Sequence, residues 1–230
     1  MALILNLETA TTVCSVALAQ NGKFIAEKEI DNGYSHSQNL AIFIKEVLAE
    51  TGKKPTDLNA IAISKGPGSY TGLRIGVSTA KGLCYALNIP LIAVPTLEVM
   101  VESLSLTLSK GEGMLLCPML DARRMEVYTA LYDIEGNEKK TVCAEIIDES
   151  AFQKELENNM VYFFGNGAEK CKSVLGNHSN ANFIDEVYPS AKSMAALSQT
   201  KFDKKEFEDV AYFEPFYLKD FVATTPKKLI

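Results

Sequence analysis

The chain has 230 residues, of which 47% are hydrophobic and 23% charged, and its formal net charge is −6. This apolar fraction excludes intrinsic disorder, the lack of any apolar run near roughly 18 residues excludes a helical membrane span, and the negative charge argues against a free-standing nucleic-acid-binding domain. At roughly 150 residues per domain, the length predicts one large domain or two small ones.

The start of the chain is predicted to form three strands. Their patterns cover Leu3–Leu7, Val13–Ala19 and Phe24–Ile30. Asn21-Gly22 between the last two strands is the dipeptide that favours a tight hairpin, because both positions need positive φ.

A helix is predicted next, because apolar residues recur at helical spacing from Leu40 to Leu48. Ser35 and Gln38 have the spacing of a capping box at its start. Gly52 suits the left-handed position that follows the last turn of a helix.

The first half continues with alternating strands and helices. A strand is predicted at Ile61–Ser64, a helix over Thr71–Leu87 and a buried strand at Leu91–Val94. A bridging helix over Thr96–Leu108 then leads to a boundary at Lys110–Gly113.

The second half repeats this order of elements. Its predicted elements are strands Met114–Leu120, Glu126–Tyr132 and Thr141–Ile147, helix Ser150–Glu157, strand Val161–Phe164, helix Ala168–Leu175 and strand Asn182–Ile184. Two tandem βββαβα lobes are the pattern of the actin, sugar-kinase and Hsp70-like (RNase H-like) architecture, so we predict an α/β fold with a reduced second lobe. The predicted domains are residues 1–110 and 111–230. The aromatic run Phe213–Leu218 is expected to pack back on the fold.

The densest motif is GPGSYTGLRIG at Gly66–Gly76, between a strand and a helix, where backbone amides can hold an anion. It departs from known phosphate loops, because Thr71 replaces the third glycine of G-x-G-x-x-G, Pro67 lacks an amide hydrogen and no P-loop lysine follows. We interpret it as a constrained turn that aims the next helix, with nucleotide binding as the alternative.

Small residues recur every four positions in that next helix, at Gly72, Gly76 and Ala80. A glycine inside a helix costs about 1 kcal/mol relative to alanine, so this stripe predicts close packing against another element. Two interpretations stay open: packing against the first helix of the same lobe, or binding of a partner helix.

The sequence motifs with which proteins of this architecture bind nucleotides are incomplete in this chain. Its kinases and ATPases hold phosphate and magnesium with an Asp-x-Gly-Thr hairpin in each lobe, and neither corresponding segment of this chain has the glycine. A glycine-containing loop, Gly165–Gly167, is present at the position where these proteins bind adenosine. Autonomous ATP hydrolysis is therefore not expected, and the residues form at most a vestigial nucleotide site: Glu8, Thr9, Asp121, Arg123, Gly165 and Gly167.

Metal and thiol chemistry lack their usual residues. The two histidines, His36 and His178, have no H-x-x-x-H or H-E-x-x-H spacing, so no metal site and no cofactor are predicted. The five cysteines form no C-x-x-C pair, and the N-terminus lacks a basic signal-peptide region. A cytoplasmic protein is expected.

Several motifs together resemble the TsaB family. In chain order they are ILNLETATTVCSVAL, HSQNL, GPGSYTGLRIG, DARRMEVY and GNG. The family is the non-catalytic bacterial partner of TsaD, which transfers a threonylcarbamoyl group to the tRNA adenosine beside the anticodon. The resemblance covers most of the chain up to Gly176, and Glu8 departs from the aspartate that is more frequent in the family.

The resemblance implies a scaffold rather than an enzyme. TsaD binds a metal through H-x-x-x-H, whereas this chain has Pro95–Met100 there, without histidine. The family pairs with TsaD, or with itself when TsaD is missing, through its first two helices; the ATPase TsaE joins the pair, and tRNA is contacted at most indirectly. With the small-residue stripe included, the implied contact surface is His36, Asn39, Ile42, Phe43, Tyr70, Leu73, Arg74, Gly76, Val77 and Ala80.

Two other functional classes stay open. A small-molecule kinase or ATPase of the same fold would need an intact phosphate hairpin. A metallopeptidase would need histidine ligands.

Overall fold

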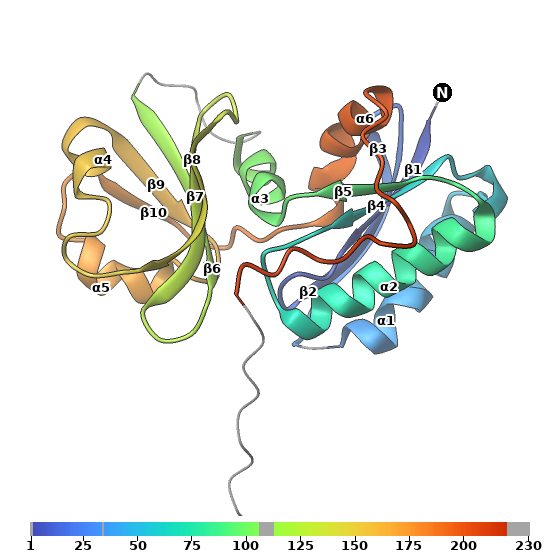
Figure 1. Cartoon of the computed structure of the whole chain (residues 1–230), viewed down its shortest axis with the longest axis horizontal. Helices are drawn as coiled ribbons and strands as arrows, with labels where there is room; N and C mark the ends of the chain where they lie inside the picture. Colours follow the sequence, from blue (N-terminus) through green and yellow to red (C-terminus); the bar gives the residue numbers. More distant parts are fainter. Residues whose placement is uncertain (1, 34, 106–112, 220–230) are drawn as a thin grey trace, which may run out of the picture.

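The computed structural model describes residues 2–33, 35–105 and 113–219. Two five-stranded mixed sheets form two lobes that lie side by side, and a helix, α3 (Thr96–Ser105), lies between them (Figure 1). Among these residues, no helix combines the length and the apolar character that crossing a membrane requires.

The first sheet has the strand order β3-β2-β1-β4-β5. Its strands are β1 (Leu3–Glu8), β2 (Val13–Gln20), β3 (Lys23–Asp31), β4 (Ala60–Ser64) and β5 (Leu91–Val94). β1, β2 and β3 pair antiparallel, whereas β4 pairs parallel with both β1 and β5. Asn21 and Gly22 both have positive φ, which confirms the predicted hairpin turn.

The second sheet repeats this order as β8-β7-β6-β9-β10, with the same pattern of antiparallel and parallel pairs. Its strands are β6 (Met114–Asp121), β7 (Glu126–Asp133), β8 (Glu138–Ile146), β9 (Met160–Phe164) and β10 (Ala181–Ile184). The predicted tandem α/β lobes of actin-like type are therefore confirmed.

Helices cover both faces of the first sheet. On one face lie α1 (His36–Glu50) and α2 (Tyr70–Leu87), and on the other lie the short helix η3 (Ala191–Met194) and α6 (Ala195–Asp203). The other helices of the described residues have six residues or fewer: η1 (Pro55–Asp57), α4 (Gln153–Asn158), η2 (Glu169–Cys171) and α5 (Lys172–Leu175). β1 and β2 are almost completely buried because both faces are covered.

The two ends of α1 differ in how well the sequence predicts them. The expected capping box is wrong, because the Ser35 side chain makes no bond to the helix backbone and donates instead to Asn32 Oδ1 at 2.6 Å. Gly52 has a φ of +66° directly after the C-cap Thr51, as predicted.

Replacing Gly52 by alanine is expected to lower the free energy of unfolding by about 1 kcal/mol, because a side chain disfavours the left-handed conformation. A Cβ there would meet open space, so crowding adds nothing. Urea unfolding measures the loss, and Gly52→Asn is the matched control, because asparagine adopts this conformation more readily. Equal losses in both variants would contradict this explanation.

The C-terminal part of the chain returns to the first lobe. Met194, Leu197 and Phe202 cover the second face of the first sheet, so the predicted domain 111–230 does not hold as a packing unit. Residues 190–219 pack with the first lobe, and α6 is an element that the sequence patterns do not predict. The predicted extension of the bridging helix to Leu108 and the boundary at 110–112 lie outside the described residues.

Candidate functional site

Helices α1 and α2 lie next to each other and carry the ten residues predicted to contact a partner. Half of these residues are buried inside the lobe: His36, Leu73, Gly76, Val77 and Ala80. The other half are at least partly accessible, and we call them the helix-pair face: Asn39, Ile42, Phe43, Tyr70 and Arg74. Two members of this face are exposed, Ile42 and Arg74, and the apolar one, Ile42, has 50% of its surface accessible.

The small-residue stripe of α2 faces its own lobe. A Cβ on Gly72 would collide with the backbone oxygen of Thr9 and touch the ring of His36. A Cβ on Gly76 would collide with the side chain of Thr9. The prediction of direct partner contact therefore does not hold for Gly76 or for the buried Ala80, and packing within the lobe accounts for the stripe.

The turn between β1 and β2 is tied to both helices by hydrogen bonds. The bonds run from Thr9 Oγ1 to Gly72 O (2.9 Å), from Ser69 N to Ala10 O (2.7 Å) and from His36 Nε2 to Thr11 O (2.8 Å). The last bond makes Nε2 the protonated nitrogen of the ring, and burial lowers the pKa of His36. The turn that corresponds to the phosphate hairpin of related ATPases thus braces α1 and α2 instead.

Glu8 ends β1 with a completely buried carboxyl group. Its Oε1 accepts a hydrogen bond from Ala10 N at 2.5 Å, whereas Oε2 has no hydrogen-bond partner among the described residues, and neither has the nearby Ser64 Oγ. Burial raises the pKa of Glu8 to about 7, although the hydrogen bond from the Ala10 amide lowers it. Glu8 does not line the cleft described below, so its carboxylate is not presented to a ligand there.

A polar row continues from Glu8 across the sheet, because the register aligns Glu8 with Ser15 and Ser15 with Glu29. The Ser190 hydroxyl lies 2.7 Å from Glu27 Oε1 and 2.6 Å from Glu29 Oε2. Burial raises the pKa of Glu27, although the hydrogen bond from Ser190 lowers it.

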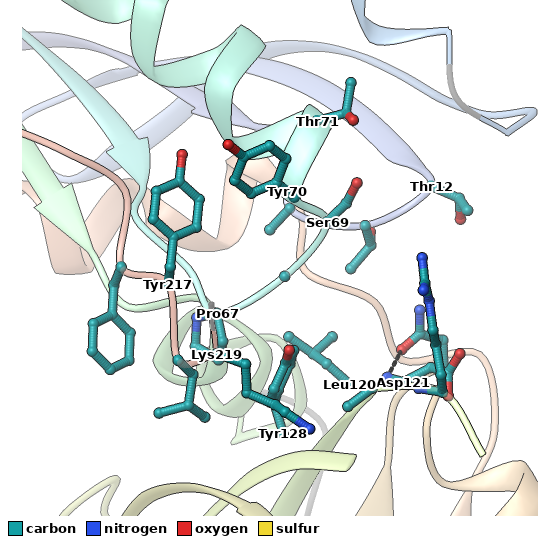
Figure 2. Close-up of a pocket in the computed structure, with 18 residues that line it drawn as sticks. Thr12, Pro67, Ser69, Tyr70, Thr71, Leu120, Asp121, Tyr128, Tyr217 and Lys219 are labelled. Atoms are coloured by element: carbon teal, nitrogen blue, oxygen red, sulfur yellow. Dashed lines mark hydrogen bonds between the residues drawn. The ribbon is translucent and has the colours of Figure 1, made fainter. Parts of the chain in front are cut away.

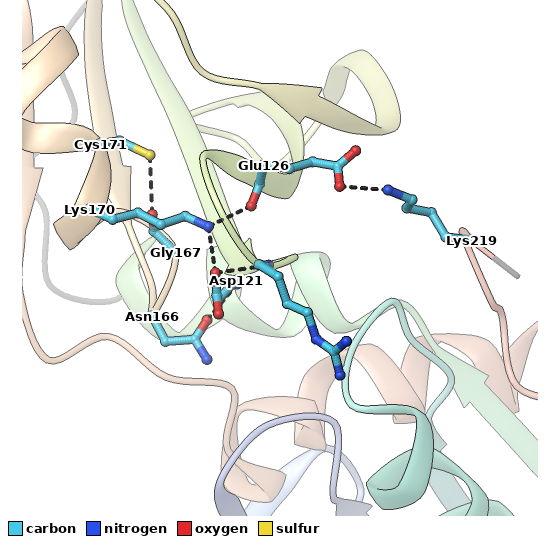
Figure 3. A network of polar contacts seen from close by, with 8 residues as sticks. Asp121, Glu126, Asn166, Gly167, Lys170, Cys171 and Lys219 are labelled. Carbon is cyan, nitrogen blue, oxygen red and sulfur yellow. Dashed lines mark hydrogen bonds and ion pairs between the residues drawn. The ribbon is translucent and has the colours of Figure 1, made fainter. Parts of the chain in front are cut away.

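In the second lobe, Asp121 is held by neighbouring groups (Figure 3). It pairs with Lys170, and its backbone amide donates to Asn166 Oδ1 at 3.0 Å. A Cβ on Gly165 or Gly167 would collide with the backbone of β6. These two glycines therefore let the loop after β9 pack closely on β6, and need no ligand to explain them.

A cleft of about 680 Å³ lies between the lobes (Figure 2). Three parts of the chain line it: residues 10–12 and 67–71 of the first lobe, 120–123, 128 and 166 of the second lobe, and 216–219 near the C-terminus. Of the six residues predicted as a vestigial nucleotide site, Asp121 and Arg123 line this cleft, whereas Glu8, Thr9, Gly165 and Gly167 do not. The structure thus does not bring the six together around one ligand-sized space.

No group of three or more histidine, cysteine, aspartate or glutamate side chains that could hold a metal ion occurs in the described part of the chain. His36 is bonded to the backbone of the β1–β2 turn, and the Nδ1 of His178 accepts from Asn180 N at 3.2 Å within its own loop. Both histidines thus have structural roles.

Sequence reasoning missed the place of the C-terminal segment in this region. Phe213–Leu218 packs back on the fold as predicted, but it also forms one wall of the cleft and reaches the first turn of α2. Its aromatic composition was the available signal, and composition does not say which surface such a segment covers.

Comparison with known proteins gives consistent results. The family model described as TsaD, tRNA N6-adenosine threonylcarbamoyltransferase, matches residues 32–227. The tRNA threonylcarbamoyladenosine biosynthesis protein TsaB of Escherichia coli is 32% identical over 229 residues, with 96% of each chain covered. TsaB of Bacillus subtilis is 30% identical, with 94% of this chain and 93% of that protein covered.

Solved structures agree at the level of the fold. A Pseudomonas aeruginosa protein described as similar to peptidase YeaZ superposes with a TM-score of 0.82 at 24% identity, covering 95% of this chain and all of that one. An activator of 2-hydroxyisocaproyl-CoA dehydratase from Clostridium difficile, solved with ADPNP, gives a TM-score of 0.50 at 9% identity, covering 90% of this chain and 98% of that one.

Proposed function

The chain belongs to the TsaB family, and from that membership we propose that it is a non-catalytic scaffold that supports TsaD in forming threonylcarbamoyladenosine on tRNA. The observation that carries the scaffold role is that the helix-pair face lies beside the β1–β2 turn, which corresponds to the phosphate hairpin of ATPases with this fold. The polar groups of the turn brace α1 and α2, and these helices present Ile42 and Arg74 to solvent.

We infer that the chain does not itself catalyse the transfer. The residues that would hold phosphate in an ATPase of this fold are occupied or buried, since Thr9 is bonded to Gly72 O and Glu8 is completely buried. This arrangement disfavours the alternative, a small-molecule kinase or ATPase of the same fold. Tight binding of Mg-ATP with turnover by the isolated chain would contradict the scaffold role.

The proposed partner is TsaD, which would bind through the helix-pair face. TsaE would join this pair, and a second copy of the chain would occupy the same face when TsaD is absent. The net charge of −6 fits a subunit that leaves most of the tRNA contact to its partners. The five free cysteines fit the reducing cytoplasm.

Replacing Ile42 by glutamate is expected to weaken binding to the cognate TsaD at least tenfold, because a charge would be buried in an apolar contact. Isothermal calorimetry with purified TsaD measures this loss. Ile146→Glu on β8 is the matched control, since Ile146 is an exposed isoleucine of the other lobe, at 69% exposure. Wild-type affinity of Ile42→Glu, or an equal loss in the control, would contradict the proposed interface.

A further inference from the structure

The segment that follows α6, residues 206–219, runs along the first lobe to the cleft, and we call it the C-terminal strap (Figure 1). Backbone groups fix its course at successive points. The anchoring bonds are Glu208 N to Leu91 O (2.9 Å), Lys81 Nζ to Ala211 O (3.2 Å) and Phe213 O (2.8 Å), and Phe216 N to Lys65 O (2.7 Å). Because Lys81 lies on α2, the strap is fixed to the helix itself as well as to the sheet.

The strap also fits closely against the loop that leads into α2. A Cβ on Gly66 would collide with the Phe216 carbonyl oxygen, and Gly66 has a φ of +112° that other residues rarely adopt. The GPGSYTGLRIG motif thus begins with a glycine whose lack of a side chain leaves room for the strap. The strap therefore packs directly against the loop that leads into the first turn of α2.

At this turn the strap places an aromatic ring beside the helix-pair face. The rings of Tyr217 and Tyr70 lie with their centroids 5.0 Å apart, and Figure 2 shows them side by side. The Arg74 guanidinium lies 5.3 Å from the centre of the Tyr70 ring, and Arg74 Nη1 donates to the Tyr70 hydroxyl at 2.9 Å. Tyr217, Tyr70 and Arg74 thus form one contiguous group, which we call the stack, with its two rings tilted by 38° to each other.

The stack holds the Arg74 guanidinium in a restricted set of conformations. Stacking on aromatic rings restricts the conformations of an arginine, so less entropy is lost when a partner binds it. A guanidinium next to phenol rings suits a partner helix that carries a carboxylate beside apolar side chains. Two of the three stacked residues, Tyr70 and Arg74, belong to the helix-pair face, and Tyr217 continues that face without a break.

We propose that the part of the C-terminal strap beside α2, Phe216–Leu218, belongs to the partner-binding surface and that the rest of the strap does not, with Tyr217 as the residue that positions Tyr70 and Arg74 for TsaD. This inference rests on the proposed function. Beyond Tyr217, Lys219 pairs with Glu126 of the second lobe at 2.6 Å, so the end of the strap is held by both lobes.

The test compares three full-length variants in calorimetric titrations with the cognate TsaD. Tyr217→Ala is expected to weaken binding about three- to tenfold, the range of an aromatic pair. Tyr217→Phe keeps the ring and is expected to bind like the wild type. Tyr212→Ala is the control on the same strap, because Tyr212 is 85% exposed, and it is also expected to bind like the wild type.

A double-mutant cycle separates positioning from general stability. If Tyr217 acts through the stack, the losses from Tyr217→Ala and Arg74→Ala will not add, whereas additive losses would overturn the inference. Tyr217→Leu, which keeps the apolar volume, replaces Tyr217→Ala if thermal unfolding shows that the alanine variant is not folded.

Other outcomes are equally decisive. Wild-type affinity of Tyr217→Ala, or an equal loss in Tyr212→Ala, overturns the inference and leaves the proposed function intact. A wild-type chain that does not bind TsaD overturns both. An effect of Tyr217→Ala on self-association alone, measured by sedimentation, assigns the surface to a second copy of the chain and overturns the assignment to TsaD.

Discussion

Replacing Gly72 by alanine is expected to lower the free energy of unfolding by about 3 kcal/mol, although alanine is the better helix former. The new Cβ would collide with the backbone oxygen of Thr9, which cannot turn away as a flexible side chain could. The same residue, Thr9, donates to Gly72 O, so the crowding would also disturb this bond. Urea unfolding at neutral pH measures the loss.

Gly82 provides the matched control, because it lies in the same helix and a Cβ added there would have no neighbouring atom within 4 Å. Gly82→Ala is expected to raise the free energy of unfolding by about 0.5–1 kcal/mol, the ordinary gain of helix propensity. A Gly72→Ala variant as stable as the wild type would show that α2 is not packed on the β1–β2 turn.

Replacing Glu8 by glutamine is expected to stabilise the protein by about 3 kcal/mol at pH 8 and to change stability little below pH 4.5. The wild-type carboxyl has a pKa raised from 4.5 to about 7, and such a difference corresponds to about 3 kcal/mol between its two protonation states. Because the folded pKa is raised, the stabilising contribution of the protonated carboxyl is complete below pH 4.5 and is lost as the pH rises to about 7.

The neutral glutamine removes this loss and fits the site, since its amide can donate toward the unpartnered Ser64 Oγ. Urea unfolding of both proteins at pH 5 and pH 8 measures the effect. Glu157→Gln, at an exposed position of α4, serves as the control and is expected to show no such dependence on pH. If the free energies of unfolding of the wild type and of Glu8→Gln changed equally between pH 5 and pH 8, Glu8 would be ionised at both pH values and its raised pKa would be contradicted.

The fold can be predicted from the sequence where local signals decide it. The strand Leu91–Val94 has the bounds that its apolar run predicts, and Asn21-Gly22 defines its hairpin, because both rest on neighbouring residues alone. The capping box failed because the spacing of Ser35 and Gln38 permits that pair of bonds without fixing the backbone angles at Ser35. The helix α6 was missed because its covering role depends on a sheet that is distant from it in the sequence.

The candidate site was harder to predict, for a physical reason. An amphipathic pattern shows that Leu73 and Val77 face something apolar, and it does not distinguish the core of the lobe from a partner. The stripe at Gly72 and Gly76 signals a close approach in the same way, without naming the neighbour, which is the β1–β2 turn. For the accessible residues Ile42 and Arg74, contact with a partner stays a prediction that rests on the resemblance to a family.

The return of the C-terminal part to the first sheet has a consequence for biosynthesis. A ribosome delivers β1–β5 first, yet one face of that sheet, with Ile4 and Ile92, is covered by Met194 and its neighbours. The second lobe, which lies between these segments in the sequence, has all of its strands by Ile184. The lobe that is translated first is therefore the last to be completed, because Ile4 and Ile92 lack part of their apolar cover until Met194 and α6 have been synthesised.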